Sequence, residues 1–167
     1  MQRRLVLMRH AKSSWRDGTL SDHVRPLNGR GRKDAPRMGQ ELAARGWVPG
    51  LVASSDSART RETWDRMRTP LGAPDLEVLW SNELYLADLS DLRAHAAGWD
   101  DAISSALALG HNPGWSDAAS ILAGRPISMT TANCALLVGH GASWIEALGG
   151  PWELVALLRP RELPLID

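Results

Sequence analysis

Short apolar runs alternate with amphipathic segments along the whole chain, and this alternation restricts the fold more than any other sequence feature. Each apolar run is long enough for a buried strand and too short for a core helix. The expected strands are residues 5–8, 51–53, 76–79, 105–109, 134–138 and 153–158. The alternation predicts an α/β fold, a three-layer sandwich in which helices flank a mostly parallel central sheet.

Capping residues and helix stops delimit the segments between these runs. Helices are expected over about 28–46, 55–68, 88–96 and 113–124, with a short one around 144–145. Asn28 is placed to cap the first, and Pro36 either kinks it or marks its true first turn. Ser55 or Asp56 can cap the second, and Asp88 or Ser90 the third. No linker or repeat interrupts this pattern, so residues 1–167 are expected to form a single domain.

The balanced net charge hides an asymmetry between the two parts of the chain. Residues 1–68 hold 15 Lys and Arg against 7 Asp and Glu, whereas residues 69–167 hold 4 against 12. A basic half suits an anionic ligand. Nucleic acid is the obvious alternative, but the arginines are spread over several elements and no binding motif accompanies them, so no nucleic-acid partner is expected.

The remaining bulk features concern the compartment. Cys134 is the single cysteine and cannot form an intrachain disulfide, which fits a reducing environment. The apolar run after the basic start is too short for a signal peptide, and no stretch approaches the ~18 apolar residues of a membrane span. A cytoplasmic location and no membrane partner are therefore expected.

Two of the predicted strands end in a histidine. The first run stops at Arg9 and His10, and the fourth is followed by Gly110 and His111. A parallel sheet places both histidines at the same edge, where ligands of open α/β sheets bind. Arg59 falls in the first turn of the helix after the second strand, and helix N-termini favour anions. Trp15 either lines this site or packs at its rim.

With these residues in hand, the chain resembles the histidine phosphatase superfamily, whose relatives include the phosphoglycerate mutases. Within it, the chain is most similar to the small bacterial phosphohistidine phosphatases of the SixA type. The matching segments are MRHAKSSW, VRPLNGRG, VASSDSARTRET, NELY and GHNPG, in the family's order. The opening RHAKS departs from the commoner RHG, and the chain has no room for the cap of larger members. The resemblance thus implies a phosphoglycerate mutase-like fold with an open pocket.

The resemblance also implies roles for individual residues. His10 is expected to be the nucleophile, with Arg9 and Arg59 binding the phosphoryl group and holding the imidazole neutral. His111 is implied as the second catalytic histidine, and Ser13 and Arg25 as further phosphate contacts. Glu83 lies where many members carry the acid that protonates the leaving group; the alternative is a loop carboxylate paired with an arginine. No cofactor or metal is expected, because the histidines lack ligand-like spacing.

The expected reaction is the hydrolysis of a phosphorylated protein or a small phosphorylated metabolite, with inorganic phosphate as product. Phosphohistidine on a signalling protein is one substrate class. A small-molecule phosphomonoesterase or a mutase is the alternative within the superfamily. A non-catalytic phosphate-binding α/β domain is the alternative from another class, but it would need no second histidine such as His111.

Overall fold

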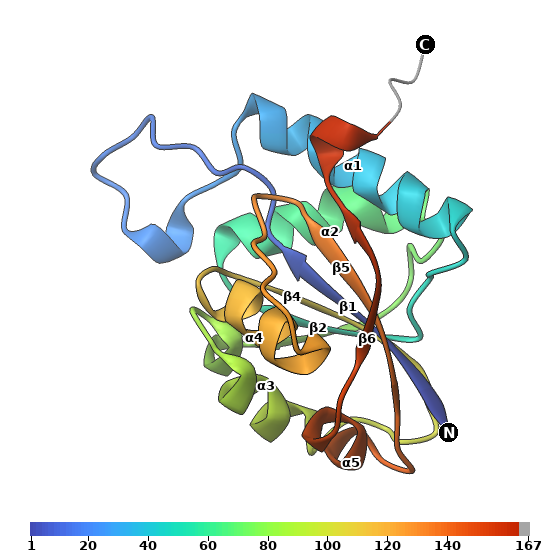
Figure 1. The fold of residues 1–167 in the computed structure, drawn as a ribbon. Helices are drawn as coiled ribbons and strands as arrows, with labels where there is room; N and C mark the ends of the chain where they lie inside the picture. Colours follow the sequence, from blue (N-terminus) through green and yellow to red (C-terminus); the bar gives the residue numbers. More distant parts are fainter. Residues whose placement is uncertain (164–167) are drawn as a thin grey trace.

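The computed structural model describes residues 1–163. Its six strands form one sheet in the order β3-β2-β4-β1-β5-β6 (Figure 1). Neighbours are parallel from β3 to β1, whereas β5 is antiparallel to both β1 and β6. The strands are β1 (Gln2–Arg9), β2 (Leu51–Ser55), β3 (Val78–Ser81), β4 (Ser105–Gly110), β5 (Cys134–His140) and β6 (Glu153–Leu158).

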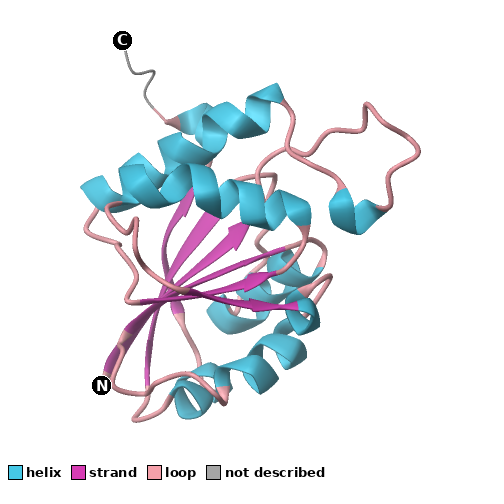
Figure 2. Cartoon of the chain, turned by 180° about the vertical axis from the view of Figure 1, so that it is seen from behind, coloured by secondary structure: helices cyan, strands magenta, loops and turns pink. Residues whose placement is uncertain are grey.

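Helices cover both faces of the sheet, which confirms the predicted three-layer sandwich (Figure 2). On one face lie α1 (Gly29–Ala44) and α2 (Ala58–Leu71). On the other lie α3 (Leu89–Ala96), α4 (Gly114–Ala123) and α5 (Trp144–Gly149). A buried apolar cluster fills each of the two interfaces, and the side chains of β1 alternate between them: Leu5 and Leu7 join one, Val6 and Met8 the other. This alternation follows from the two-residue period of a strand.

The local helix signals were right in part. Asn28 caps α1 by accepting a hydrogen bond from the Gly31 N–H, and Asp88 caps α3 in a reciprocal capping box with Asp91. Pro36 lies inside α1 and not in its first turn. The prediction that Ser55 or Asp56 caps α2 is wrong, since Ser57 does so. Ser55 is the last residue of β2, so the helix cannot begin until the chain has left the sheet.

The third strand begins two residues later than predicted. It spans Val78–Ser81 and pairs in parallel with β2, so that Ser81 lies opposite Ser55. Pairing with the preceding strand, rather than the apolar run alone, therefore sets its end. Among the described residues, no helix combines the length and apolarity needed to cross a bilayer.

Candidate active site

His10 follows the last residue of β1 and is held on both sides by neighbouring segments. Its N–H donates to the Gly110 carbonyl at 3.0 Å, and its carbonyl accepts from the Ala132 N–H at 2.9 Å. The ring Nδ1 lies 2.7 Å from the carbonyl oxygen of Ala11. A carbonyl only accepts, so Nδ1 carries the proton and Nε2 carries the lone pair. The backbone thus prepares Nε2 as a nucleophile.

The second histidine lies at the same edge of the sheet. His111 follows β4, the parallel neighbour of β1, and its ring centroid is 5.2 Å from that of His10. Its Nε2 lies 2.8 Å from Ser55 Oγ at the end of β2. Ser55 Oγ also accepts from the Ser57 N–H at 3.2 Å, so its own hydroxyl proton is available for His111. In that arrangement the His111 proton is on Nδ1.

Both imidazoles are neutral at physiological pH. Burial and, to a smaller extent, the cationic Arg59 and Arg9 lower the pKa of His10 to about 3, against the opposing effect of the hydrogen bond to Ala11. Burial also lowers the pKa of His111 to about 3, helped by His10 and Arg59. Neutral histidine is the nucleophilic form, so the environment keeps His10 reactive near pH 7.

Two arginines approach the histidines from different elements. Arg59, in the first turn of α2, donates from Nε to His10 Nε2 at 3.3 Å. Arg9, the last residue of β1, donates from Nη1 to the Met129 carbonyl at 3.1 Å. Within residues 1–163, Arg9 Nε and His111 Nδ1 are buried nitrogens without a hydrogen-bond partner. An oxyanion placed between these groups would supply the missing acceptors.

These side chains line a cavity of about 370 Å³, a size common for small-ligand sites. The exposed Trp15 and Leu86 form part of its rim; 67% of Trp15 and 57% of Leu86 is accessible to solvent. The lining residues are Arg9, His10, Lys12, Ser13, Trp15, Asp22, Arg59, Leu86, His111, Asn112 and Thr131. Trp15 is therefore one of the lining residues, with its exposed ring at the rim of the cavity.

Asp22 connects the loop after β1 to the arginine. It belongs to a short 3-10 helix, η1 (Asp22–Val24), and its carboxylate accepts from Arg59 Nη2 at 2.9 Å and from the Tyr85 hydroxyl. Arg59 Nη1 also donates to the Asp22 carbonyl at 2.7 Å. Partial burial raises the pKa of Asp22, but the bonds from Tyr85 and Arg59 outweigh burial, and the pKa ends below its usual value. Asp22 is therefore an anion, and its two bonds orient the Arg59 guanidinium.

The structure brings five of the seven predicted site residues to this cavity: Arg9, His10, Ser13, Arg59 and His111. Arg25 is not among the lining residues. Its guanidinium carbon is 3.4 Å from the centroid of the Trp15 ring, and its Nη2 is 3.7 Å from an Asp22 oxygen. Arg25 thus supports two lining residues and does not line the cavity itself.

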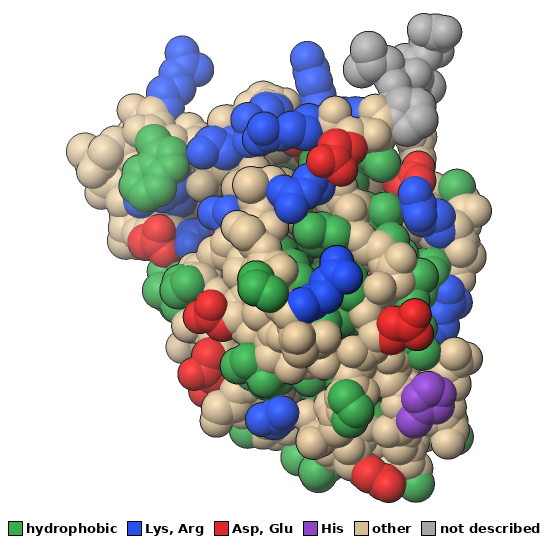
Figure 3. Space-filling model, in the orientation of Figure 1, with side chains coloured by type: hydrophobic (Ala, Val, Ile, Leu, Met, Phe, Trp, Pro, Cys, Tyr) green, Lys and Arg blue, Asp and Glu red, His purple; other side chains and the backbone are tan. Residues whose placement is uncertain are grey.

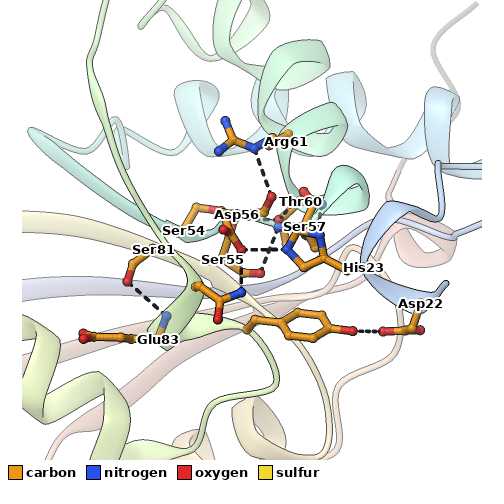
Figure 4. Close-up of polar contacts among 12 residues, drawn as sticks. Asp22, His23, Ser54, Ser55, Asp56, Ser57, Thr60, Arg61, Ser81 and Glu83 are labelled. Atoms are coloured by element: carbon orange, nitrogen blue, oxygen red, sulfur yellow. Dashed lines mark hydrogen bonds and ion pairs between the residues drawn. The ribbon is translucent and has the colours of Figure 1, made fainter.

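Glu83 lies outside the cavity. It is exposed in the 3-10 helix η2 (Asn82–Leu84), where its N–H donates to Ser81 Oγ at 3.1 Å. Figure 4 shows its carboxylate directed away from Asp22 and His23. It lines a different hollow, together with His95 and Trp99. This placement weighs against the role of proton donor that the resemblance implied, and it also gives Glu83 no arginine partner among the described residues.

Asp22, Ser55 and Tyr85 belong to the site, but none was predicted as a site residue, although Ser55 and Tyr85 lie in the matching segments VASSDSARTRET and NELY. Asp22 and Tyr85 are 63 positions apart, and Ser55 and His111 are 56 apart. One signal was available: Ser55 ends an apolar strand that is parallel to the two histidine strands, so its side chain reaches the same edge. Across residues 1–163, no group of three or more His, Cys, Asp and Glu side chains has the geometry of a metal site.

The fold and this cavity define a known class. Residues 5–95 match the model of the histidine phosphatase superfamily (branch 1), and the chain belongs to this superfamily. It is 41% identical to an uncharacterized chloroplastic protein of Arabidopsis thaliana, across 96% of this chain and 79% of that protein.

Solved structures of SixA proteins share the fold. The SixA protein of Agrobacterium tumefaciens, assigned as a phosphohistidine phosphatase, is 25% identical and superposes with a TM-score of 0.80 over 95% of this chain and 98% of its own. The protein histidine phosphatase SixA in complex with tungstate is 23% identical, with a TM-score of 0.81 over 98% of this chain and 100% of its own. The chain therefore has the fold of the small SixA proteins without an inserted cap.

Proposed function

We propose that this protein is a metal-independent phosphatase that works through a phosphohistidine on His10, with phosphohistidine on a protein as the substrate. The observation that carries the proposal is the hydrogen bond from His10 Nδ1 to the Ala11 carbonyl at 2.7 Å. It leaves the lone pair on Nε2, next to Arg59 and His111. A non-catalytic phosphate-binding domain would not need a neutral histidine held in one tautomer.

The reaction takes place in two displacements. His10 Nε2 attacks phosphorus, the bond to the leaving group breaks, and the phosphoryl group is transferred to the ring. Water then attacks the phosphohistidine, and the bond to Nε2 breaks to release inorganic phosphate. The fixed charges of Arg9 and Arg59 stabilise the phosphoryl oxygens in both steps, and the His111 Nδ1–H donates to one of them. To do so, Arg59 exchanges its bond to the His10 lone pair for one to the phosphoryl group.

The position of Glu83 favours one leaving group over another. An alkoxide is nearly as basic as hydroxide and needs a proton in the transition state, whereas a phosphohistidine protonated on its second ring nitrogen releases neutral imidazole, whose conjugate acid has a pKa of ~6.5, with little help. A cavity without Glu83 suits the second case. The structural similarity to SixA proteins supports the same choice, and phosphomonoester hydrolysis or mutase activity on a small metabolite is the alternative. The cytoplasmic location stays a prediction.

A covalent phosphoenzyme tests the proposal. After rapid quench of a reaction with a phosphohistidine peptide, mass spectrometry should find acid-labile phosphate on His10. The label and the turnover should be absent in His10→Ala, whereas His140→Ala, a change at an exposed histidine, should retain both. Activity should also survive exhaustive chelation. Phosphate on a serine, full activity of His10→Ala, or a many-fold restoration by added magnesium would contradict the mechanism.

A further inference from the structure

A second hollow adjoins the catalytic cavity on the side of α1. It measures about 520 Å³ and lies between α1, the loop before β5 and the 3-10 helix η3 (Pro160–Glu162). We call it the basic groove, and the lining residues that matter here are Arg30, Lys33, Asp34, Arg37, Thr131 and Arg161. Thr131 lines both hollows, and Arg30 Nη2 donates to its hydroxyl at 3.1 Å. The groove is thus continuous with the rim of the active site.

The groove carries an excess of positive charge. Arg30, Lys33 and Arg37 are three and four positions apart, so they share one face of α1 over about 10 Å. Arg161 approaches from η3. Figure 3 shows Lys and Arg side chains gathered over this upper end of the molecule, above a surface where acidic and apolar side chains are scattered. Part of the positive charge of residues 1–68 therefore lies beside the site.

Asp34 neutralises only part of this charge. Its oxygens lie 3.8 Å from Arg30 Nε and 3.6 Å from Arg37 Nη1, distances longer than those of a direct hydrogen bond. Burial raises the pKa of this carboxyl group, since the charged form is poorly solvated there. Among residues 1–163, Lys33 and Arg161 are exposed and have no carboxylate partner. An acidic ligand would complement all four cations.

The dimensions of the groove indicate the kind of ligand. A cationic row of about 10 Å is longer than one phosphate group needs, and it suits several carboxylates in succession. Its side chains are largely solvated, as is usual for surfaces that steer a charged macromolecule before contact. The exposed Trp15 at the rim of the neighbouring cavity is a residue type enriched in protein interfaces.

We propose that the basic groove docks an acidic segment of the phosphorylated protein substrate, next to the phosphohistidine that enters the catalytic cavity. The inference rests on the proposed function for the substrate class. Peptide binding can be tested separately from catalysis, because an acidic peptide would occupy the groove whether or not a phosphoryl group is transferred.

Binding of two matched peptides tests this docking site. Both carry a non-hydrolysable phosphohistidine mimic and a fluorophore; one continues with a run of glutamates, the other with glutamines. Fluorescence anisotropy gives Kd for wild type, Lys33→Gln/Arg161→Gln and Arg125→Glu. The last two change the formal charge equally, and Arg125 is exposed and outside both hollows. Turnover of an aryl phosphate, which does not reach the groove, controls for an intact active site.

The double variant should raise the Kd of the glutamate peptide about tenfold, because two exposed charge pairs are lost, and should leave the Kd of the glutamine peptide unchanged. Arg125→Glu should bind both peptides like wild type. The difference in Kd between the wild type and the double variant for the glutamate peptide should vanish in ~1 M salt, where the Debye length falls to about 3 Å. Equal loss in Arg125→Glu and the double variant would reduce the effect to net charge and overturn the proposal. Equal binding of both peptides by wild type would do the same.

Two further outcomes separate this inference from the proposed function. If no phosphoenzyme forms but the preference for glutamate is lost only in the double variant, the docking site stands and the catalytic proposal fails. If the double variant instead lowers kcat/KM for a sugar bisphosphate and not the peptide affinity, the groove receives a second phosphate of a small substrate, and the docking proposal is wrong.

Discussion

Arg3 and Arg9 lie on the same strand, β1, near its two ends, and the protein treats them differently. Arg3 is fully buried, and its guanidinium donates to four carbonyl oxygens, those of Gly141, Ala142, Asp101 and Ile103, at 2.8–3.2 Å. Arg9 is half-buried, donates to one carbonyl and keeps a buried Nε without a partner among the described residues. Burial and the nearby Arg59 lower the pKa of Arg9.

The difference teaches how a structural arginine is told from a ligand-binding one. Arg3 uses four of its five N–H donors, and these bonds tie the loop between β5 and α5 and the loop before β4 to the start of the sheet. Arg9 has unused hydrogen-bonding capacity directed at a cavity, so its remaining bonds are available to an anion. An unsatisfied buried donor costs about 1–3 kcal/mol, a cost that is recovered when substrate binds. The arginine at the amino end of β1 thus stabilises the fold, and the arginine at its carboxyl end is available to bind the substrate.

The largest expected effect is at the structural end. Arg3→Met should lower the free energy of unfolding by about 3 kcal/mol or more, because several buried carbonyls lose their donor. For a chain of this size the melting temperature should fall by about 6–12 °C. Calorimetry measures this, with Arg125→Met as the exposed control. The activity per folded molecule should persist; a stable Arg3→Met protein that is inactive would break the comparison.

At the other end, Arg9→Lys should leave the melting temperature nearly unchanged and lower kcat by ~10² or more, because an ammonium cannot replace a planar guanidinium at a phosphoryl group. Steady-state kinetics with an aryl phosphate measure the loss. A reduction of kcat by only two- or threefold, or a fall in melting temperature as large as that of Arg3→Met, would show that Arg3 and Arg9 do not have separate structural and ligand-binding roles.

A smaller effect is expected for the residue that orients His111. Ser55→Ala removes the hydroxyl group 2.8 Å from His111 Nε2 and should lower kcat about tenfold, through a loss of ring orientation. Ser54→Ala is the matched control: its hydroxyl is equally buried and donates to the Ser55 carbonyl, not to His111. If both variants lose activity alike, Ser55 acts through the strand and not through the histidine.

The smallest effect is expected at Glu83. Because the carboxylate lies outside the cavity, Glu83→Gln should change kcat/KM by less than about twofold for both a phosphohistidine peptide and an alkyl phosphate. A selective loss of ~10² on the alkyl phosphate would restore Glu83 as the general acid. It would also mean that substrate binding moves η2 toward His10.

The sequence by itself determined the architecture and the centre of the site. Apolar runs of strand length fixed the alternation of strands and helices, and polar residues at the ends of those runs marked Arg9, His10 and His111. These are local signals, since periodicity and capping act over a few residues. For the same reason the end of β3 and the cap of α2, which depend on sheet pairing, were misplaced.

Only the tertiary structure decided which side chains join that centre. Asp22, Ser55 and Tyr85 reach the site through contacts between positions far apart in the chain, and no local pattern encodes such contacts. Glu83 and Arg25 were placed at the site by resemblance, yet Glu83 lines a different hollow and Arg25 packs against the Trp15 ring without lining the cavity. The distinction between Arg3 and Arg9 is of the same kind. Both are arginines of one strand, and only the residues packed around them determine whether their N–H donors bind backbone carbonyls or are available to a ligand.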